Sequence, residues 1–210
     1  MKPDQYRKSP CQSSSLPYWK SQTMRIPENM AVVLDDRFEE ADYPGFSDDP
    51  YFKLVHRLTG LKKPSLDSRF QLASREIQDF AKHIDECYEG KMNGDDLISY
   101  PQRPTYDPAL WIAVVDEDDR LIGSAIGEID SEIGEGIIEW VEVSKEYRKQ
   151  GLGAYLVDEL LWRMKEKVNF VTVSGRVNNE SNPEALYRKC GFGEKTIWHI
   201  LAKKNLEGRT

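Results

Sequence analysis

The chain has 210 residues, of which 39% are hydrophobic and 31% charged, and its net charge is −7. These proportions are ordinary for a domain that folds in water, and the length suffices for one large or two small domains with a substantial core. No apolar run approaches the roughly 20 residues that a membrane-spanning helix needs, and the polar start lacks the apolar stretch of a secretory signal, so we expect a cytoplasmic protein with no membrane partner.

The charge is unevenly distributed. From residue 70 onward the chain carries 18 Lys and Arg against 26 Asp and Glu, whereas the first 69 residues are nearly balanced. An acidic region disfavours nonspecific binding of nucleic acid, which needs a basic surface, and is compatible with a cationic amine substrate. Cys11, Cys87 and Cys190 lack C-x-x-C spacing and the three histidines are dispersed, so we expect neither a disulfide framework nor a metal site.

Residues 1–69 differ in character from the rest. The first 17 are rich in Ser, Pro, Gln and charge, which favours a loosely ordered start. Residues 30–34 are a candidate strand, and the apolar spacing in residues 48–58 fits a short amphipathic helix. Because this extension is too small for a large core of its own, we expect it to pack on a main domain formed by residues 70–210.

The main domain is predicted to begin with a strand at residues 70–73, followed by a helix that Ser74 caps. A shorter helical piece should run from Gly94 to about Tyr100. Next, residues 110–115 and 121–129 are two apolar runs joined by D-E-D-D, which predicts a hairpin with an acidic turn.

A strand, a loop and a helix are predicted next. Residues 137–143 are apolar and β-branched, and after a polar connection the apolar residues recur at spacings of three, four and seven, which is typical of a helix with one buried stripe. The stripe contains Leu152, Leu156, Val157, Leu160, Leu161, Met164 and Val168. Residues 170–174 predict a further strand.

The last predicted elements are a helix and a strand. Asn182 suits an N-cap, Pro183 the first helical position and Gly191 the residue after the helix. Residues 196–201 predict a terminal strand.

The turn before the long helix is suited to phosphate. The first N–H groups of a helix have no partners and carry partial positive charge, and Gly151 and Gly153 allow close approach of the backbone. Arg148 and Lys149 add positive charge. The spacing fits neither the G-x-x-x-x-G-K-[ST] loop nor the G-x-G-x-x-G fingerprint, since Leu156 stands at the third glycine position.

The segment R-K-Q-G-L-G resembles the [RQ]-x-x-G-x-[GA] signature of the GNAT superfamily of acyl-CoA-dependent N-acyltransferases. The ending L-Y-x-x-x-G-F after Asn182 is similar to a second signature of that family, and the resemblance spans about residues 70–202. It implies an α/β (α+β) fold: a mixed, mostly antiparallel sheet that splays between its fourth and fifth strands and is flanked by helices.

The resemblance also implies a donor and its site. The donor would be acetyl-CoA, with no metal, and an amine acceptor would be the partner; a homodimer is compatible with the family. The segment between the first two helices of the main domain usually contacts the acceptor. The implied cofactor-binding residues are Val141, Val143, Arg148, Lys149, Gln150, Gly151, Leu152, Gly153 and Asn179, with Asn178 and Asn182 as alternatives to Asn179.

Acetyl transfer to an amine needs a group that takes the amine proton, and a carboxylate can do so. Glu128, Glu139 and Glu142 are near the central strand, where a carboxylate is costly unless solvated or paired. Strict alternation places Glu139 with Val141 and Val143, and Glu142 on the opposite face. We favour Glu139 as the base, with Glu142 as the alternative because a bulge would reverse the alternation.

Tyr187 occupies the position of the family's tyrosine near the thioester sulfur, so the resemblance implies that it protonates the departing thiolate. The expected function is N-acetyl transfer from acetyl-CoA to a primary amine by direct attack in a ternary complex. Two alternatives are transfer to a protein or peptide amine, and a non-catalytic CoA-binding sensor or interaction module.

Overall fold

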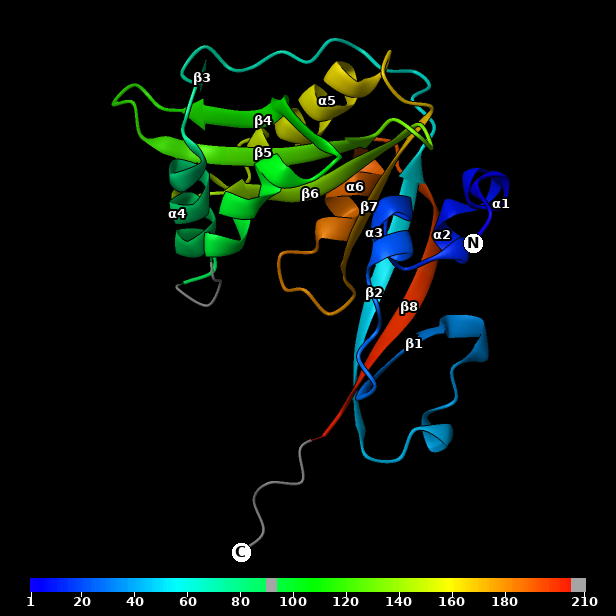
Figure 1. Ribbon diagram of the computed structural model, residues 1–210. Coiled ribbons are helices and arrows are strands. Elements are labelled where there is room, and N and C mark those ends of the chain that lie inside the picture. Colours follow the sequence, from blue (N-terminus) through cyan, green and yellow to red (C-terminus); the bar gives the residue numbers. More distant parts are fainter. Residues whose placement is uncertain (90–93, 205–210) are drawn as a thin grey trace, which may run out of the picture.

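The computed structural model describes residues 1–89 and 94–204 (Figure 1). The α-helices are α1 (Pro3–Lys8), α2 (Pro10–Ser13), α3 (Tyr18–Thr23), α4 (Ile77–Cys87), α5 (Leu152–Met164) and α6 (Pro183–Lys189). The strands are β1 (Met30–Leu34), β2 (Phe46–His56), β3 (Gln71–Ala73), β4 (Tyr106–Val115), β5 (Leu121–Asp130), β6 (Glu135–Val143), β7 (Phe170–Arg176) and β8 (Gly193–Lys203). Short 3-10 helices are η1 (Asp35–Arg37), η2 (Glu40–Asp42), η3 (Gly94–Gln102) and η4 (Lys145–Tyr147).

The strands form one eight-stranded sheet in the order β1-β8-β2-β7-β6-β5-β4-β3. Every neighbouring pair is antiparallel except β6 and β7, which are parallel. Their pairing covers only residues 135–138 of β6 and 170–173 of β7, although both strands continue. Counted from residue 70, β6 and β7 are the fourth and fifth strands, so the expected mixed sheet with its splay is confirmed.

Helices cover both faces of this sheet (Figure 1). The largest core cluster joins α5 and α6 to one face, where the whole predicted stripe from Leu152 to Val168 is buried. On the other face, α4 and η3 form a second cluster around Phe80 and Trp111. The N-terminal helices form a third cluster on that face, near β2 and β7. Two apolar faces covered by helices explain why the central strands contain so few exposed residues.

The expected helix at residues 48–58 is wrong, because this segment is the strand β2, which lies between β7 and β8. From Phe52 to His56 every residue is buried, since the strand is covered on both faces. A strand of this kind loses the polar/apolar alternation that normally distinguishes it from a helix. The strand expected at residues 30–34 is confirmed as β1.

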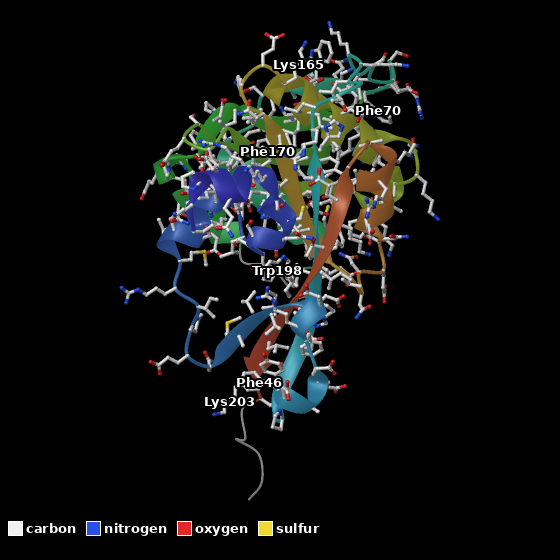
Figure 2. The ribbon with its side chains drawn as sticks, turned by 90° about the vertical axis from the view of Figure 1, so that its right-hand side faces the viewer. Phe46, Phe70, Lys165, Phe170, Trp198 and Lys203 are labelled. Carbon is white, nitrogen blue, oxygen red and sulfur yellow. The ribbon has the colours of Figure 1, made fainter. Side chains whose placement is uncertain are left out.

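The loosely ordered start expected for residues 1–17 is also wrong. Tyr6 is fully buried, and its hydroxyl donates to Glu135 at 2.7 Å. Buried Lys53 donates to the Tyr6 oxygen at 3.0 Å and to the carbonyl oxygen of Leu16 at 2.7 Å. Figure 2 shows the N-terminal helices in front of Phe170 in β7, and the Tyr6 and Phe170 rings lie 6.3 Å apart.

The predicted elements of the main domain are present, with one change of cap. Glu76, rather than Ser74, caps α4, and its side chain and that of Asp79 form a reciprocal capping box. The piece expected from Gly94 is the 3-10 helix η3. Residues 90–93 of the expected acceptor-contacting segment lie outside the described residues. Within the described ranges, no helix is both long and apolar enough to cross a membrane.

Candidate active site

A pocket of about 330 Å³ lies where β6 and β7 separate. It is bounded by the last paired residues of both strands, by β2, and by the segment leading into α3. Its lining residues are Ser15, Leu16, Pro17, Lys20, Asp49, Tyr51, Ile137, Ile138, Glu139, Thr172, Val173, Ser174 and Ile200. The N-terminal residues thus supply a large part of the wall.

A β-bulge in β6 determines where the glutamates point. Ile126 of β5 is paired with Trp140 and the next residue, Gly127, with Ile138, so Glu139 is the extra residue. After the bulge, Val141 packs in the α5 cluster and Trp140 in the α4 cluster. The alternation expected from the sequence is therefore wrong: Glu139 and Glu142 contact groups on the same face of the sheet, the face that carries α3 and α4.

Glu139 is held by a lysine from the N-terminal extension. The Nζ atom of Lys20 in α3 lies 2.6 Å from Oε1 of Glu139. The side chains are only 17% and 14% exposed, so this ion pair is largely shielded from water. Glu135 accepts the Tyr18 N–H at 2.9 Å and so holds α3 on the sheet. Lys20, which is in the same helix, is therefore positioned beside Glu139.

Glu128, on the neighbouring strand β5, is fully buried beside this pair. Its Oε1 atom accepts from Arg103 at 3.2 Å, and among the described residues its Oε2 atom has no hydrogen-bond partner. Burial, followed by the negative charge of nearby Glu139, raises the pKa of Glu128 to about 7, although the charges of Arg103 and Lys20 oppose this shift. Near neutral pH this carboxyl group can therefore take up or release a proton.

Glu142 lies further along β6 and accepts a hydrogen bond from the hydroxyl of Tyr88, which follows α4. Burial raises the pKa of Glu142 to about 7, although the Tyr88 bond and the charge of Arg148 act in the opposite direction. Both Glu128 and Glu142 are thus carboxyl groups that titrate near neutrality, as a general base requires.

The loop before α5 has the geometry of an anion site. Gly151 is the N-cap of α5 with φ +87°, and Lys149 is also left-handed with φ +62°. No side chain caps this helix, so its first N–H groups are not satisfied by a cap. A Cβ added to Gly151 would meet no atom within 4 Å, so the space beside it is open. The loop therefore has the features of a site for an anion such as a phosphate group.

The neighbouring loop residues have distinct contacts. Gly153 faces α6, where an added Cβ would lie 3.3 Å from Leu186, and Leu152 is buried in the core. The side chains of Arg148 and Gln150 are exposed. Arg148 Nε donates to the Val143 carbonyl oxygen at 3.0 Å, and Gln150 accepts from Arg69 at 3.3 Å.

The backbone of Val141 and Val143 pairs with β5 on one side only. On the other side, the recorded pairing with β7 ends at Ile138, before either residue is reached. This edge of β6 can form backbone hydrogen bonds with an extended chain, as an added strand does. The carbonyl oxygen of Val143 already accepts a hydrogen bond from Arg148.

Tyr187 in α6 is buried on the face that carries α5. Its ring packs against Phe192 at 5.7 Å and against Phe52 of β2 at 6.4 Å. Burial, followed by the negative charge of Glu142, raises the pKa of the Tyr187 phenol well above its ordinary value. The phenol therefore keeps its proton at neutral pH and can act only as a proton donor or a neutral hydrogen-bond partner.

The loop asparagines differ in their contacts. Asn179 Oδ1 accepts from the Ser181 N–H at 2.9 Å and from the Ser181 hydroxyl at 2.8 Å, which orders the loop before α6. Asn182 is the N-cap of α6, and its side chain accepts from the Ala185 N–H. Asn182 therefore has a structural task, and Asn179 keeps its amide NH₂ for other partners.

Lys20, Asp49 and Tyr51 are pocket residues that sequence reasoning missed. Arg176 of β7 contacts both Asp49, at 3.0 Å, and Tyr51, at 2.9 Å. The apolar residues around position 52 are the local signal of this segment, and their helical spacing predicts a helix rather than a strand of the sheet. Within the described part of the chain, no group of three or more His, Cys, Asp or Glu side chains is arranged to hold a metal ion.

A parallel strand pair that separates beside a glycine-bearing helix start defines the class of acyl-CoA-dependent transferases expected from the sequence. A sequence profile described as the acetyltransferase (GNAT) family matches residues 77–192, which is more than half of the chain. The chain belongs to this family. A search of curated proteins found no match.

Many solved structures share the fold. A GCN5-related N-acetyltransferase from Sphaerobacter thermophilus is 18% identical, with TM-score 0.61, over 76% of this chain and 54% of its own. A functionally unknown protein from Staphylococcus epidermidis is 16% identical, with TM-score 0.61, over 84% and 73%. A GNAT acetyltransferase from Colwellia psychrerythraea is 13% identical, with TM-score 0.58, over 83% and 65%. At these identities the likeness concerns the fold, and the match to the Sphaerobacter protein spans about half of that protein.

Proposed function

We propose that the protein transfers an acetyl group from acetyl-CoA to a primary amine by direct attack in a ternary complex. The observation that carries this proposal is the pocket at the separation of β6 and β7, with Glu139 in its wall. The open loop at Gly151 supports a donor site beside it. Acetyl-CoA supplies the activated acetyl group as a thioester.

The residues of this chain would divide the work as follows. The N–H groups at the start of α5, with Arg148, Lys149 and Gln150 beside them, hold the donor's phosphates, and the free edge of β6 at Val141 and Val143 aligns its extended arm. Asn179 offers its amide to the same arm. A backbone N–H at Val141 or Val143 polarises the thioester carbonyl group.

Proton transfer is assigned to two side chains. Glu139 lines the pocket and takes the proton of the acceptor amine, so that the amine can attack. Tyr187 keeps its proton until the thiolate departs and then donates it. Glu142, with its raised pKa, is the alternative base, and the pH measurements described in the Discussion separate the two.

The pocket does not determine which primary amine is the acceptor. Its carboxylates are already matched by cations: Glu139 by Lys20 and Asp49 by Arg176. The acceptor can be a small amine or an amine of a peptide, and both belong in the same assay. A CoA-binding sensor would bind the donor as an enzyme does, so only turnover distinguishes them.

The test is release of CoA thiol from acetyl-CoA with a panel of amines, polyamines and short peptides. We expect turnover with at least one acceptor class, and a fall in kcat of roughly 100-fold or more in Tyr187→Phe, because a positioned acid contributes about that much. Tyr155→Phe is the matched control, since its ring only packs beside the core. Binding of acetyl-CoA without turnover on any acceptor would favour the sensor, and failure to bind it would refute the proposal.

A further inference from the structure

Lys20 occupies the place that an acceptor amine would need. A general base must be within hydrogen-bond reach of the proton that it takes, about 2.6–3.2 Å between heavy atoms. The Nζ atom of Lys20 lies 2.6 Å from Oε1 of Glu139, and both residues line the pocket at the separation of β6 and β7. A primary amine that belongs to the chain itself is therefore already positioned at the proposed base.

No other lysine among the described residues has this arrangement. The recorded ion pairs of Lys82, Lys165, Lys167 and Lys195 are with carboxylates outside β6. Lys53 is also close to the N-terminal segment, but its Nζ atom donates to Tyr6 and to two backbone carbonyl groups. Among the described lysines, Lys20 is thus the one whose recorded ion pair is with a carboxylate of β6.

The surroundings can also accommodate the released proton. Glu128 is fully buried next to Glu139, and its Oε2 atom has no partner among the described residues. The other carboxyl oxygen of Glu128 forms an ion pair with Arg103 at 3.2 Å. A proton that leaves Lys20 can therefore reside on Glu139 or pass to the free oxygen of Glu128.

We propose that Lys20 is a self-acetylation site, modified by the donor bound to the same chain. This inference rests on the proposed acetyl transfer. The Lys20 ammonium loses a proton to Glu139, its Nζ atom forms a bond to the acetyl carbonyl carbon, and the carbon–sulfur bond breaks. The sulfur takes up the proton of Tyr187 and leaves as the free CoA thiol, the second proton of the attacking nitrogen replaces the one that Tyr187 gave, and the proton on Glu139 passes to water, so one proton is released for each transfer. The product is Nε-acetyl-lysine.

Acetylation would change the pocket that it occurs in. An amide carries no charge, so the ion pair with Glu139 is lost and the carboxylate is left without its cation. The modified pocket then has one more uncompensated negative charge than the unmodified pocket. Self-acetylation would therefore increase the attraction of the pocket for a cationic acceptor.

The experiment follows labelling of the full-length chain by acetyl-CoA that carries an isotopically heavy acetyl group, which separates new acetylation from acetylation during expression. Peptide mass spectrometry compares Lys20 with Lys82, whose side chain is 78% exposed and reports chemical acetylation. We expect Lys20 to be labelled at least tenfold faster than Lys82 in the folded chain. This preference should vanish in urea, and the first-order rate should not depend on protein concentration.

Two variants sharpen the test. Glu139→Gln should lower the labelling rate of Lys20 by roughly 100-fold, because the base is lost, while labelling of Lys82 continues unchanged. Lys20→Arg should abolish the fast labelling, and Lys82→Arg should leave it intact. The comparison of Lys20 with Lys82 in the native protein needs no variant to fold.

Labelling of Lys20 no faster than that of Lys82 overturns the inference. If CoA thiol is released with an added amine while Lys20 stays unlabelled, self-acetylation is wrong and the proposed function stands. If acetyl-CoA binds but neither reaction occurs, both are wrong. A rate that rises with protein concentration shows transfer between molecules and also overturns the proposal as stated.

Discussion

At the scale of single residues, the candidate site is a set of carboxyl groups brought to one face by one extra residue. The bulge at Glu139 cannot be predicted from the sequence of β6, because it depends on how β5 pairs with it. Strict alternation therefore predicts that Glu139 and Glu142 lie on opposite faces. The identity of the glutamates could be predicted, since charge in an apolar strand is conspicuous, but Lys20 could not, because no local pattern connects α3 to β6.

The pH dependence of turnover follows from these carboxyl groups. The pKa of Glu128, which lies beside Glu139, is raised to about 7, and the negative charge of ionised Glu128 helps Glu139 to take a proton, so kcat/KM should be low at acidic pH and rise as Glu128 ionises near pH 7. Glu142→Gln should retain this rise if Glu139 is the base. The measurement is the pH–rate profile of the wild type, Glu139→Gln and Glu142→Gln.

The opposite pattern would reassign the base. If Glu142→Gln abolishes the acidic limb and most of the activity while Glu139→Gln retains both, then Glu142, with its own pKa of about 7, is the base. The acceptor in these profiles should have an amine pKa well above 9, so that its own titration stays away from the limb that is measured.

At the scale of elements, the loop and the start of α5 could be predicted well. The glycine spacing and the leucine stripe are local signals, and both the loop and the helix lie where expected. The misassigned element is β2, because its apolar residues at positions 51, 52, 54 and 55, together with Leu58 beyond its end, mimic helical spacing. A proline is normally excluded from a central strand, but at Pro50 β2 pairs with β8 alone, and it pairs with β7 only from Tyr51 onward.

The two loop glycines should respond differently to the same substitution. Gly151→Ala forces a side chain into the left-handed region, which costs about 1 kcal/mol of folding stability, and places a methyl group in the open space of the proposed phosphate site. We expect a tenfold or larger rise in the Kd for CoA. Gly153→Ala should leave this Kd unchanged, because its Cβ meets only the flexible end of Leu186.

Isothermal titration with CoA gives the two affinities, and thermal unfolding shows whether each variant remains folded at the titration temperature. Equal affinities of Gly151→Ala and the wild type would mean that the phosphates bind elsewhere. A loss in Gly153→Ala alone would point instead to the packing of α5 on α6.

At the scale of the whole molecule, the N-terminal residues belong to the sheet and to the pocket. The family profile covers residues 77–192, yet β2 pairs with β7 and β8, and Phe52 packs against Tyr187. Buried Glu135 accepts from the Tyr6 hydroxyl of α1 and from the Tyr18 N–H of α3, and buried Lys53 donates to the Tyr6 oxygen, so both helices are joined to the sheet. These long-range contacts leave no local sequence signal, so the composition of residues 1–17 wrongly indicated a loose start.

Tyr6→Phe tests this connection. The change removes the hydroxyl group that donates to Glu135 and accepts from Lys53, so both buried charges lose a partner, at a cost of about 1–3 kcal/mol. For a chain of this size we expect the Tm to fall by roughly 2–10 °C. Tyr155→Phe is the control, because its hydroxyl has no recorded hydrogen bond among the described residues. Equal Tm values for both variants and the wild type would show that the Tyr6 hydroxyl does not hold the N-terminal segment in place.

The position of β2 has a consequence for how the chain is made. Its partners in β7 and β8 follow it by more than a hundred residues, as the contact between Tyr51 and Arg176 illustrates with a separation of 125. During synthesis β2 therefore stays with both hydrogen-bonding edges open until β7 and β8 have emerged. Such non-local pairing folds slowly, and an open edge can pair with another nascent chain. Asp48, Asp49 and Pro50, at the start of the strand, are residue types that discourage that pairing, so the first half of β2 is protected during this delay.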